Sequence, residues 1–560
     1  MLSVGIAQAQ TKLVEKITRR GTELVIPYEK YVLTNGLTLL VHEDHSDPIV
    51  HVDVTYHVGS AREEVGKSGF AHFFEHMMFQ GSDHVADEEH FKIVTESGGT
   101  LNGTTNRDRT NYYETLPSNQ LERALWLEAD RMGFLLDAVT QKKFEVQRAT
   151  VKNERGQNYD NRPYGLANEY TSKNLYPYGH PYSWLTIGYI EDLDRVNVDD
   201  LKNFFLRWYG PNNAVVSIGG DVTPAQAVKL VEKYFSSIPK GPAVTKTQVP
   251  APVLTKDRYL SYEDNIRFPM LRMVFPTVPT YHPDEAPLDY LAEILGGGKN
   301  SLFYKNFVKS QKAVQANASH PSSELAGEFT LSILAYPNTK TDSTEAIVRQ
   351  TLAEFEKRSV TDDDITRYKS TYEANLIENL ASVSGKTSQL AAFQTFTGNP
   401  NYLPRELKRY QAVTRADVMR VYNQYIKGKK AVILSVYPKG KKELVTTADN
   451  YAVSKEGYQA PNYGYEGLKY TKAKDAFDRN TRPAPGKNPE IKVPPLLDAT
   501  IEQRYQDHWG QKRRDSSRNA ALLHSRWPPA FDQRPQQSRY CPTNRRDVER
   551  RNRKRFGRRV

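Results

Sequence analysis

A compact apolar pattern lies between Ser68 and Gly81. Ser68-Gly69 is able to begin a helix, and Gly81 is able to end it. The apolar residues between these limits fall on most sides of a helix; they are Phe70, Phe73, Phe74, Met77, Met78 and Phe79. We therefore predict a short helix that is buried almost all round, in which every ionisable side chain needs a partner.

A second helical pattern covers residues 144–155, where Phe144, Ala149 and Val151 have helical spacing. Pro163 stops this pattern, because a proline cannot continue a helix. The segment is otherwise polar, so we predict a helix with one buried face.

A helix–turn–strand pattern occurs twice in the chain. Residues 196–201 read as the start of a helix and are followed by the apolar strand 214–217. Residues 413–418 and the strand 431–434 repeat this order at the same spacing. Such a repeat predicts two related domains.

Two threonines strengthen the repeat, because Val139-Thr140 and Val360-Thr361 each open a predicted helix. Counted along these two helices, Glu154 falls opposite Asn375. We predict an α+β fold with two domains, residues 28–240 and 255–445, each a mostly antiparallel sheet packed on helices.

The first buried helix carries the motif His72-Phe73-Phe74-Glu75-His76. It reads H-x-x-E-H, the reverse of the common zinc-peptidase signature H-E-x-x-H. His72 and His76 are four residues apart and project from one helix face. Zinc takes two such nitrogens and a third protein ligand, and it leaves a fourth position for water. Glu75 is placed to take a proton from that water; the alternative is two core histidines satisfied by backbone groups.

A third ligand has to come from elsewhere in the chain. The helix at 144–155 contains both Glu145 and Glu154, and the residue pattern alone does not choose between them. The second domain contains no H-x-x-E-H motif, so we expect only the first domain to bind metal.

The net charge of +11 suggests a nucleic-acid or membrane partner at first sight. However, residues 504–560 hold 17 Lys and Arg against 5 Asp and Glu, which leaves 60 basic and 61 acidic residues in 1–503. The body is therefore neutral, and we expect no nucleic-acid partner. Cys541 is the only cysteine, so the body has no disulfide or thiolate chemistry.

With these motifs, the chain resembles the pitrilysin/insulinase family of zinc peptidases, which includes the mitochondrial processing peptidase. The H-x-x-E-H motif carries most of the resemblance. Further matching segments are Asn35-Gly36-Leu37, Gly59-Ser60, Glu63, Gly98-Gly99, Asn102, Thr105, Asp108, Thr110, Tyr112, residues 161–165, 180–182 and 186–188.

The resemblance implies a set of site residues. In the family a Glu some 75 to 80 residues after the motif is the third ligand, and Glu154 follows His76 by 78 residues. Asn102 and Thr105 are implied as substrate-binding residues on an edge strand. Gln147 stands where many members have a supporting Glu, and it keeps a hydrogen-bonding amide without the charge.

The resemblance also implies the activity and its partners. We expect a zinc metalloendopeptidase with one Zn²⁺ per chain that cleaves extended peptides or unfolded polypeptides. Such members enclose a chamber from two halves, so the two sheets are expected to form half of a clam-shell and to need a second homologous half or a homodimer partner. A non-catalytic peptide-binding or core subunit is the alternative.

The remaining segments give expectations about location and domain limits. Residues 1–27 contain Ala7-Gln8-Ala9, which is similar to a signal-peptidase site and favours a periplasmic or exported protein over a cytoplasmic one. Residues 446–500 read as the linker to a second half. Residues 501–560 read as a basic disordered tail, in which an out-of-frame end and a true basic arm both stay open. No apolar run approaches the roughly 18 residues of a membrane span.

Overall fold

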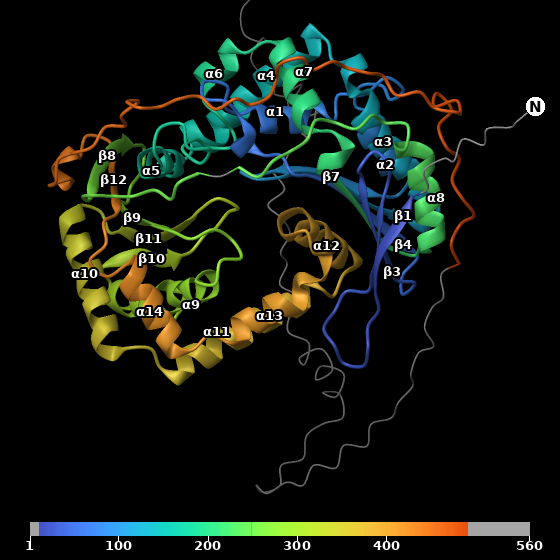
Figure 1. Cartoon of the computed structure of the whole chain (residues 1–560). Coiled ribbons are helices and arrows are strands. Elements are labelled where there is room, and N and C mark those ends of the chain that lie inside the picture. The colour runs from blue at the N-terminus through green and yellow to red at the C-terminus, as the bar shows by residue number, and fades with distance from the viewer. Residues whose placement is uncertain (1–10, 248, 491–560) are drawn as a thin grey trace, which may run out of the picture. The chain divides into compact units, whose positions relative to one another are not determined.

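The computed structural model describes residues 11–247 and 249–490. This part of the chain has an α+β fold in which helices pack on two separate sheets, as the sequence predicts (Figure 1). The Ala7-Gln8-Ala9 pattern, residues 491–500 of the predicted linker and the predicted tail at 501–560 lie outside the described residues.

The first sheet has seven strands in the order β1-β2-β3-β7-β4-β6-β5. Only the β3–β7 pair is parallel, and the other five pairs are antiparallel. The strands are β1 (Lys12–Ile17), β2 (Tyr28–Val32), β3 (Thr38–Glu43), β4 (Ile49–Tyr56), β5 (Thr100–Thr105), β6 (Thr110–Pro117) and β7 (Ala214–Gly220). β1 lies within the N-terminal segment that the sequence places before the first domain.

The second sheet has five strands in the order β10-β11-β9-β12-β8, with only β12–β8 parallel. In the first sheet the last strand, β7, lies between β3 and β4, and in the second sheet the last strand, β12, lies between β8 and β9. The strands are β8 (Arg258–Asp264), β9 (Met270–Thr277), β10 (Ala313–Ser319), β11 (Gly327–Ala335) and β12 (Val432–Pro438). This shared order confirms that the two domains are related.

The helices follow the same repeat. Thr140 and Thr361 cap their helices through their side chains, and α7 and α14 each precede the inserted strand. In the first domain the helices are α1 (Phe70–Met77), α2 (Glu89–Glu96), α3 (Leu121–Ala138), α4 (Gln141–Arg155), α5 (Ala167–Leu175), α6 (Ile190–Arg195), α7 (Val198–Trp208) and α8 (Pro224–Phe235). In the second they are α9 (Glu285–Gly296), α10 (Thr341–Arg358), α11 (Asp362–Asn379), α12 (Val383–Thr397), α13 (Leu403–Gln411) and α14 (Arg415–Tyr425).

Each domain also lends one helix to the sheet of the other. Helix α5 packs on β12 and β9, and helix α12 packs on β4 and β7. Ser217 on β7 donates a hydrogen bond to the carbonyl of Thr387 on α12 (2.9 Å). Gly219 is required beside it, because a Cβ there would lie 2.0 Å from the Thr387 hydroxyl. This exchange of helices joins residues 11–490 into one compact unit.

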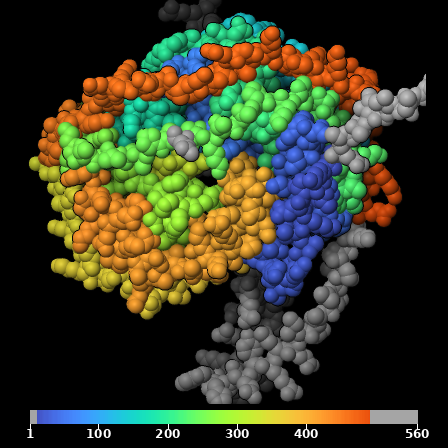
Figure 2. Space-filling model, in the orientation of Figure 1, coloured from blue at the N-terminus to red at the C-terminus, as the bar shows by residue number. Residues whose placement is uncertain are grey.

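Residues 449–490, hereafter the docked segment, contain no helix or strand but lie against the folded domains. Figure 2 shows this segment, in orange-red, running across the surface of the first-domain helices. It starts at β8, where the Asn450 N–H donates to the Tyr259 carbonyl (3.1 Å), and it reaches Asn119, whose carbonyl accepts the Gly486 N–H (2.7 Å). This part of the predicted linker is therefore packed on the protein along its length.

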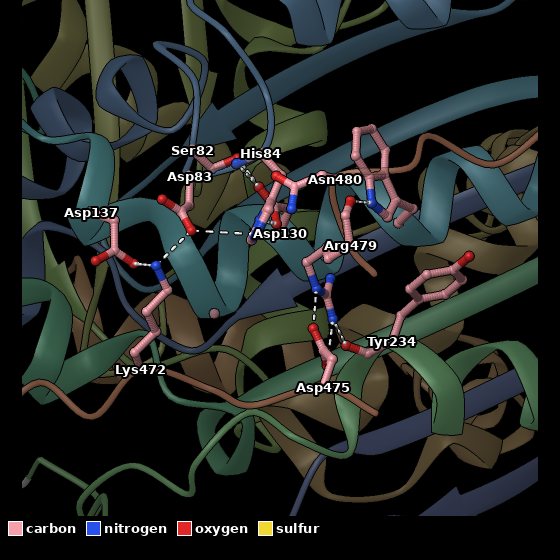
Figure 3. Close-up of polar contacts among 12 residues, drawn as sticks. Ser82, Asp83, His84, Asp130, Asp137, Tyr234, Lys472, Asp475, Arg479 and Asn480 are labelled. Carbon is pink, nitrogen blue, oxygen red and sulfur yellow. Dashed lines mark hydrogen bonds and ion pairs between the residues drawn. The ribbon is translucent and has the colours of Figure 1, made fainter. Parts of the chain in front are cut away.

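Arg479 anchors the docked segment. Its side chain is only 2% exposed, and it donates to Asp475 Oδ1 (3.1 Å) and to the Tyr234 carbonyl (2.8 Å). The Arg479 carbonyl accepts a hydrogen bond from the indole of Trp126 (3.0 Å). Figure 3 shows these contacts beside Lys472, which pairs with Asp83 on the first domain. Within the described residues, no helix is both long and apolar enough to cross a membrane.

Candidate metal centre

Helix α1 begins at a buried carboxylate. Glu63 accepts hydrogen bonds from the Gly69 N–H (2.9 Å), the Ala71 N–H (2.8 Å) and the Trp184 indole (2.9 Å). The two backbone donors belong to the first turn of the helix, whose N–H groups have no acceptor within the helix. Gly69 has φ of +93°, and a Cβ there would lie 2.8 Å from the Ile187 carbonyl. These contacts determine where α1 starts. The local sequence did not reveal that Glu63 caps this helix.

The structure brings His72, His76 and Glu154 together. Glu154 Oε2 lies 3.5 Å from His72 Nε2 and 3.4 Å from His76 Nε2. Ligand atoms about 2.1 Å from a tetrahedral zinc ion are about 3.4 Å from each other. The two distances from Glu154 therefore match those of a tetrahedral zinc site, and the three donor atoms all lie within 4.8 Å of one another.

The environment suits metal binding, which requires neutral imidazoles and an ionised carboxylate. Burial lowers the pKa of His72 to about 4, which keeps its imidazole neutral. The pKa of Glu154 is lowered by its hydrogen bond to His76 and by both imidazoles. Burial lowers the pKa of His76, but the opposing effects of Glu154 and Glu75 are larger together and raise it. This raised pKa reflects a histidine that lies against two carboxylates, the arrangement that attracts a cation.

Glu75 lies on the same helix but outside the group of three donors. Burial raises its pKa, and a hydrogen bond from Thr105 opposes that rise. A Cβ on Gly103 would lie 3.3 Å from Glu75 Cγ, so the strand β5 passes directly against this side chain. Glu75 is thus half-buried between the metal ligands and an edge strand.

The structure separates the two glutamates that the residue pattern left open. Glu145 is exposed and pairs with Arg148 (2.9 Å) on the outer surface of α4. Glu154 lies about two and a half turns later, where α4 passes into a π-helix at Gly156–Asp160. Gln147 is buried on α4 and lies close enough to His76 to contribute to the raised pKa of that histidine, and its supporting role stays a prediction.

The predicted substrate residues lie on β5, the edge strand of the first sheet. Asn102 is exposed, while Thr105 is partly buried and contacts Glu75. They therefore lie on opposite faces of one strand, as alternate directions along a strand require. Of the two, only Thr105 contacts a residue of the metal helix.

A second group of possible ligands, His90, Glu114 and Glu128, is fully buried in the first domain. It does not fit a metal ion, because the Arg131 guanidinium already lies among these side chains. Arg131 Nη2 is 2.7 Å from both His90 Nε2 and Glu128 Oε1. This internal cation supplies the positive charge that the carboxylates need. A cavity of about 690 Å³, lined by Ser68, Lys173 and others, includes none of the residues of the centre.

Comparisons with known proteins agree with this geometry. The family model described as "Insulinase (Peptidase family M16)" matches residues 38–177, and "Peptidase M16 inactive domain" matches residues 195–372. The chain belongs to peptidase family M16. The second match starts just before α7, so it covers the end of the first domain as well as most of the second.

Two curated relatives cover most of this M16 chain. Zinc protease PqqE of Helicobacter pylori is 28% identical over 420 residues, which is 73% of this chain and 93% of the relative. A probable mitochondrial-processing peptidase subunit beta of Arabidopsis thaliana is 25% identical and covers 72% of this chain and 77% of its own length.

Solved structures show the same fold. A protease from H. pylori superposes with a TM-score of 0.66 at 27% identity, covering 73% of this chain and 99% of that chain. The periplasmic protease PqqL from Escherichia coli has a TM-score of 0.60 at 18% identity, and the match covers 76% of this chain but 48% of PqqL. The described M16 unit therefore corresponds in fold to about half of PqqL.

Proposed function

We propose that the protein is a zinc-dependent metalloendopeptidase that hydrolyses extended peptides or unfolded polypeptides. The observation that carries the proposal is the spacing of His72, His76 and Glu154, which suits one zinc ion, with Glu75 beside them. Names of relatives as zinc proteases support the same assignment.

In the proposed mechanism a zinc ion, when bound, would supply Lewis-acid activation of a water molecule and of the scissile carbonyl. His72, His76 and Glu154 would hold the ion. Glu75 accepts a proton from the attacking water and passes it to the leaving amine. Its burial suits this exchange, because a raised pKa brings a carboxyl closer to the operating pH.

The edge of β5 is the proposed substrate surface. An extended peptide would add to this edge by main-chain hydrogen bonds, so that recognition depends little on side chains. Gly103 allows the strand to lie directly against Glu75, which would bring the paired peptide to the base. Asn102 and Thr105 are the proposed side-chain contacts.

We further propose that the described unit works with a second half, either another homologous half or a second copy of the chain. A matched half would cover the site and hold the peptide in line, which is worth several kcal/mol of the barrier. Oxyanion donors would add roughly 3 kcal/mol. Support comes from PqqL, of which this fold is about half. By itself the chain is expected to be weakly active.

A periplasmic or exported location is proposed from the Ala7-Gln8-Ala9 pattern and from the likeness to a protein titled periplasmic. Fractionation tests it directly: the protein is expected in the periplasmic or secreted fraction. Recovery in the cytosolic fraction alone would contradict the location.

The test of the function is a comparison of Glu75→Gln with the parent. Zinc content should be unchanged, because Glu75 is not a ligand, while cleavage of a flexible reporter peptide should nearly disappear. A parent that binds zinc and peptide without cleaving it, also when mixed with a second half, would instead identify a non-catalytic subunit.

A further inference from the structure

The direction of the backbone groups along β5 follows from its hydrogen bonds. The Asn106 N–H points to β6, because it donates to the Arg109 carbonyl (3.0 Å) across the turn. Backbone groups point alternately to either side along a strand, and the β5–β6 register has no bulge. The N–H and C=O groups of Leu101, Gly103 and Thr105 therefore point away from β6, toward the open edge.

One of these outward groups is already occupied. The Gly103 N–H donates to Oδ1 of Asn102, its neighbour in the chain, at 2.9 Å. The Asn102 side chain is exposed, so it is free to turn away without disturbing the core. Gly103 is also the residue whose absent side chain lets β5 lie against Glu75. The occupied N–H is thus on the part of the edge that lies nearest to the proposed base.

We propose that Asn102 is a displaceable cap of the substrate edge, an inference that rests on the proposed function. In the free protein its amide oxygen holds the Gly103 N–H. A bound peptide takes that N–H with one of its own carbonyls, and the released Asn102 amide turns outward and donates to the peptide. One neutral hydrogen bond replaces another, so the exchange costs little. The cap also blocks pairing of the open edge with unrelated strands.

Two substitutions separate the cap from a simple contact. Asn102→Ala removes the acceptor, so the Gly103 amide should exchange with deuterium about 5-fold faster in the free protein. Asn102→Asp keeps the acceptor and makes it charged, and such bonds are roughly twice as strong as neutral ones. It also lacks the donor group. Asn102→Asp should therefore bind peptide at least about 10-fold more weakly. Asn102→Ala loses the donor to the peptide, but it also loses the cap that the peptide has to displace, and these opposing effects should keep its binding within about 3-fold of the parent.

The experiment uses the full zinc-loaded chain carrying Glu75→Gln, so that a flexible reporter peptide binds without turnover. Deuterium exchange of residues 100–105 and the peptide Kd are measured in about 0.5 M salt, which screens the charge added by Asp. Thr104→Ala is the matched control, because Thr104 is the next residue on the same face and its hydroxyl donates to Asn111 Oδ1 (2.6 Å). It should leave the exchange of Gly103 unchanged.

The results distinguish the cap from the function. Equal exchange in Asn102→Ala and its parent would overturn the cap, and so would an Asn102→Asp variant that binds peptide as tightly as the parent. If the parent itself binds no peptide, the proposed function fails and displacement by peptide fails with it. Faster exchange in Asn102→Ala would then still show that Asn102 holds the edge.

Discussion

The two domains share one strand order, β3-β7-β4-β6-β5 in the first and β8-β12-β9-β11-β10 in the second. They differ in the helix that follows β4 in the first domain and β9 in the second. Helix α1 follows β4 and carries His72, Glu75 and His76, whereas helix α9 follows β9 and contains no histidine. Most residues of α9 are buried, including Leu288, Leu291 and Leu295.

The helices that supply the third ligand differ in the same way. Thr140 and Thr361 cap α4 and α11, and counting from these caps sets Glu154 opposite Asn375. An amide is a poor zinc ligand, so the second domain lacks every donor of the centre. The fold therefore forms without metal ligands, and three side chains on two helices make the difference between the domains.

The largest effect is expected from Glu75→Gln. Loss of a positioned general base should lower kcat by about 10²–10⁴-fold while zinc content stays at one per chain. Glu293→Gln makes the same change on α9 and should leave activity unaltered. Reporter-peptide kinetics and elemental analysis measure both. Activity of the Glu75 variant close to that of the parent would remove Glu75 from the mechanism.

A large loss of stability is expected from Arg479→Ala. Its removal leaves Asp475 buried without its partner and opens a cavity between Phe134 and Tyr234. Breaking such a buried pair costs about 3–5 kcal/mol. Around Arg479 the docked segment covers only the first domain. The core amides of the first domain should therefore lose more of their protection against hydrogen exchange than those of the second domain. Arg482→Ala, an exposed arginine nearby, serves as the control. Equal loss in both variants would mean that Arg479 is no anchor.

Glu154→Gln should weaken zinc binding by on the order of 100-fold, because a neutral amide replaces a charged ligand. Glu145→Gln on the same helix should bind zinc as the parent does, since Glu145 lies on the exposed surface. Competition with a chromogenic chelator measures the affinities. Unchanged affinity in Glu154→Gln would place the third ligand elsewhere.

The smallest effect is expected from Gln147→Ala. Residues that support a metal ligand typically contribute 10- to 100-fold in affinity, and a neutral amide at the edge of the centre should lie at the low end, about 10-fold. Gln147→Glu restores a charge beside His76 and should bind zinc at least as tightly as the parent. A chelator titration in which Gln147→Ala equals the parent would show that Gln147 only packs.

The sequence predicted those features that neighbouring residues encode together. The apolar spacing around Phe73 predicted a buried helix, and the four-residue separation of His72 and His76 set both on one face. The helix caps at Thr140 and Thr361 and the repeated helix–strand order predicted two related domains, which the common strand order confirms. These signals are local, because helix periodicity and capping depend on residues within a few turns of each other.

Only the tertiary structure decided between partners that are far apart in the chain. It set Glu154 rather than Glu145 against the histidines, and it filled the acidic group around Glu128 with Arg131. It also packed residues that read as a linker onto the first domain and turned Asn102 back onto Gly103. Polar and extended segments carry no periodic signal of their own, so their partners depend on which surfaces the folded domains bring within hydrogen-bonding distance.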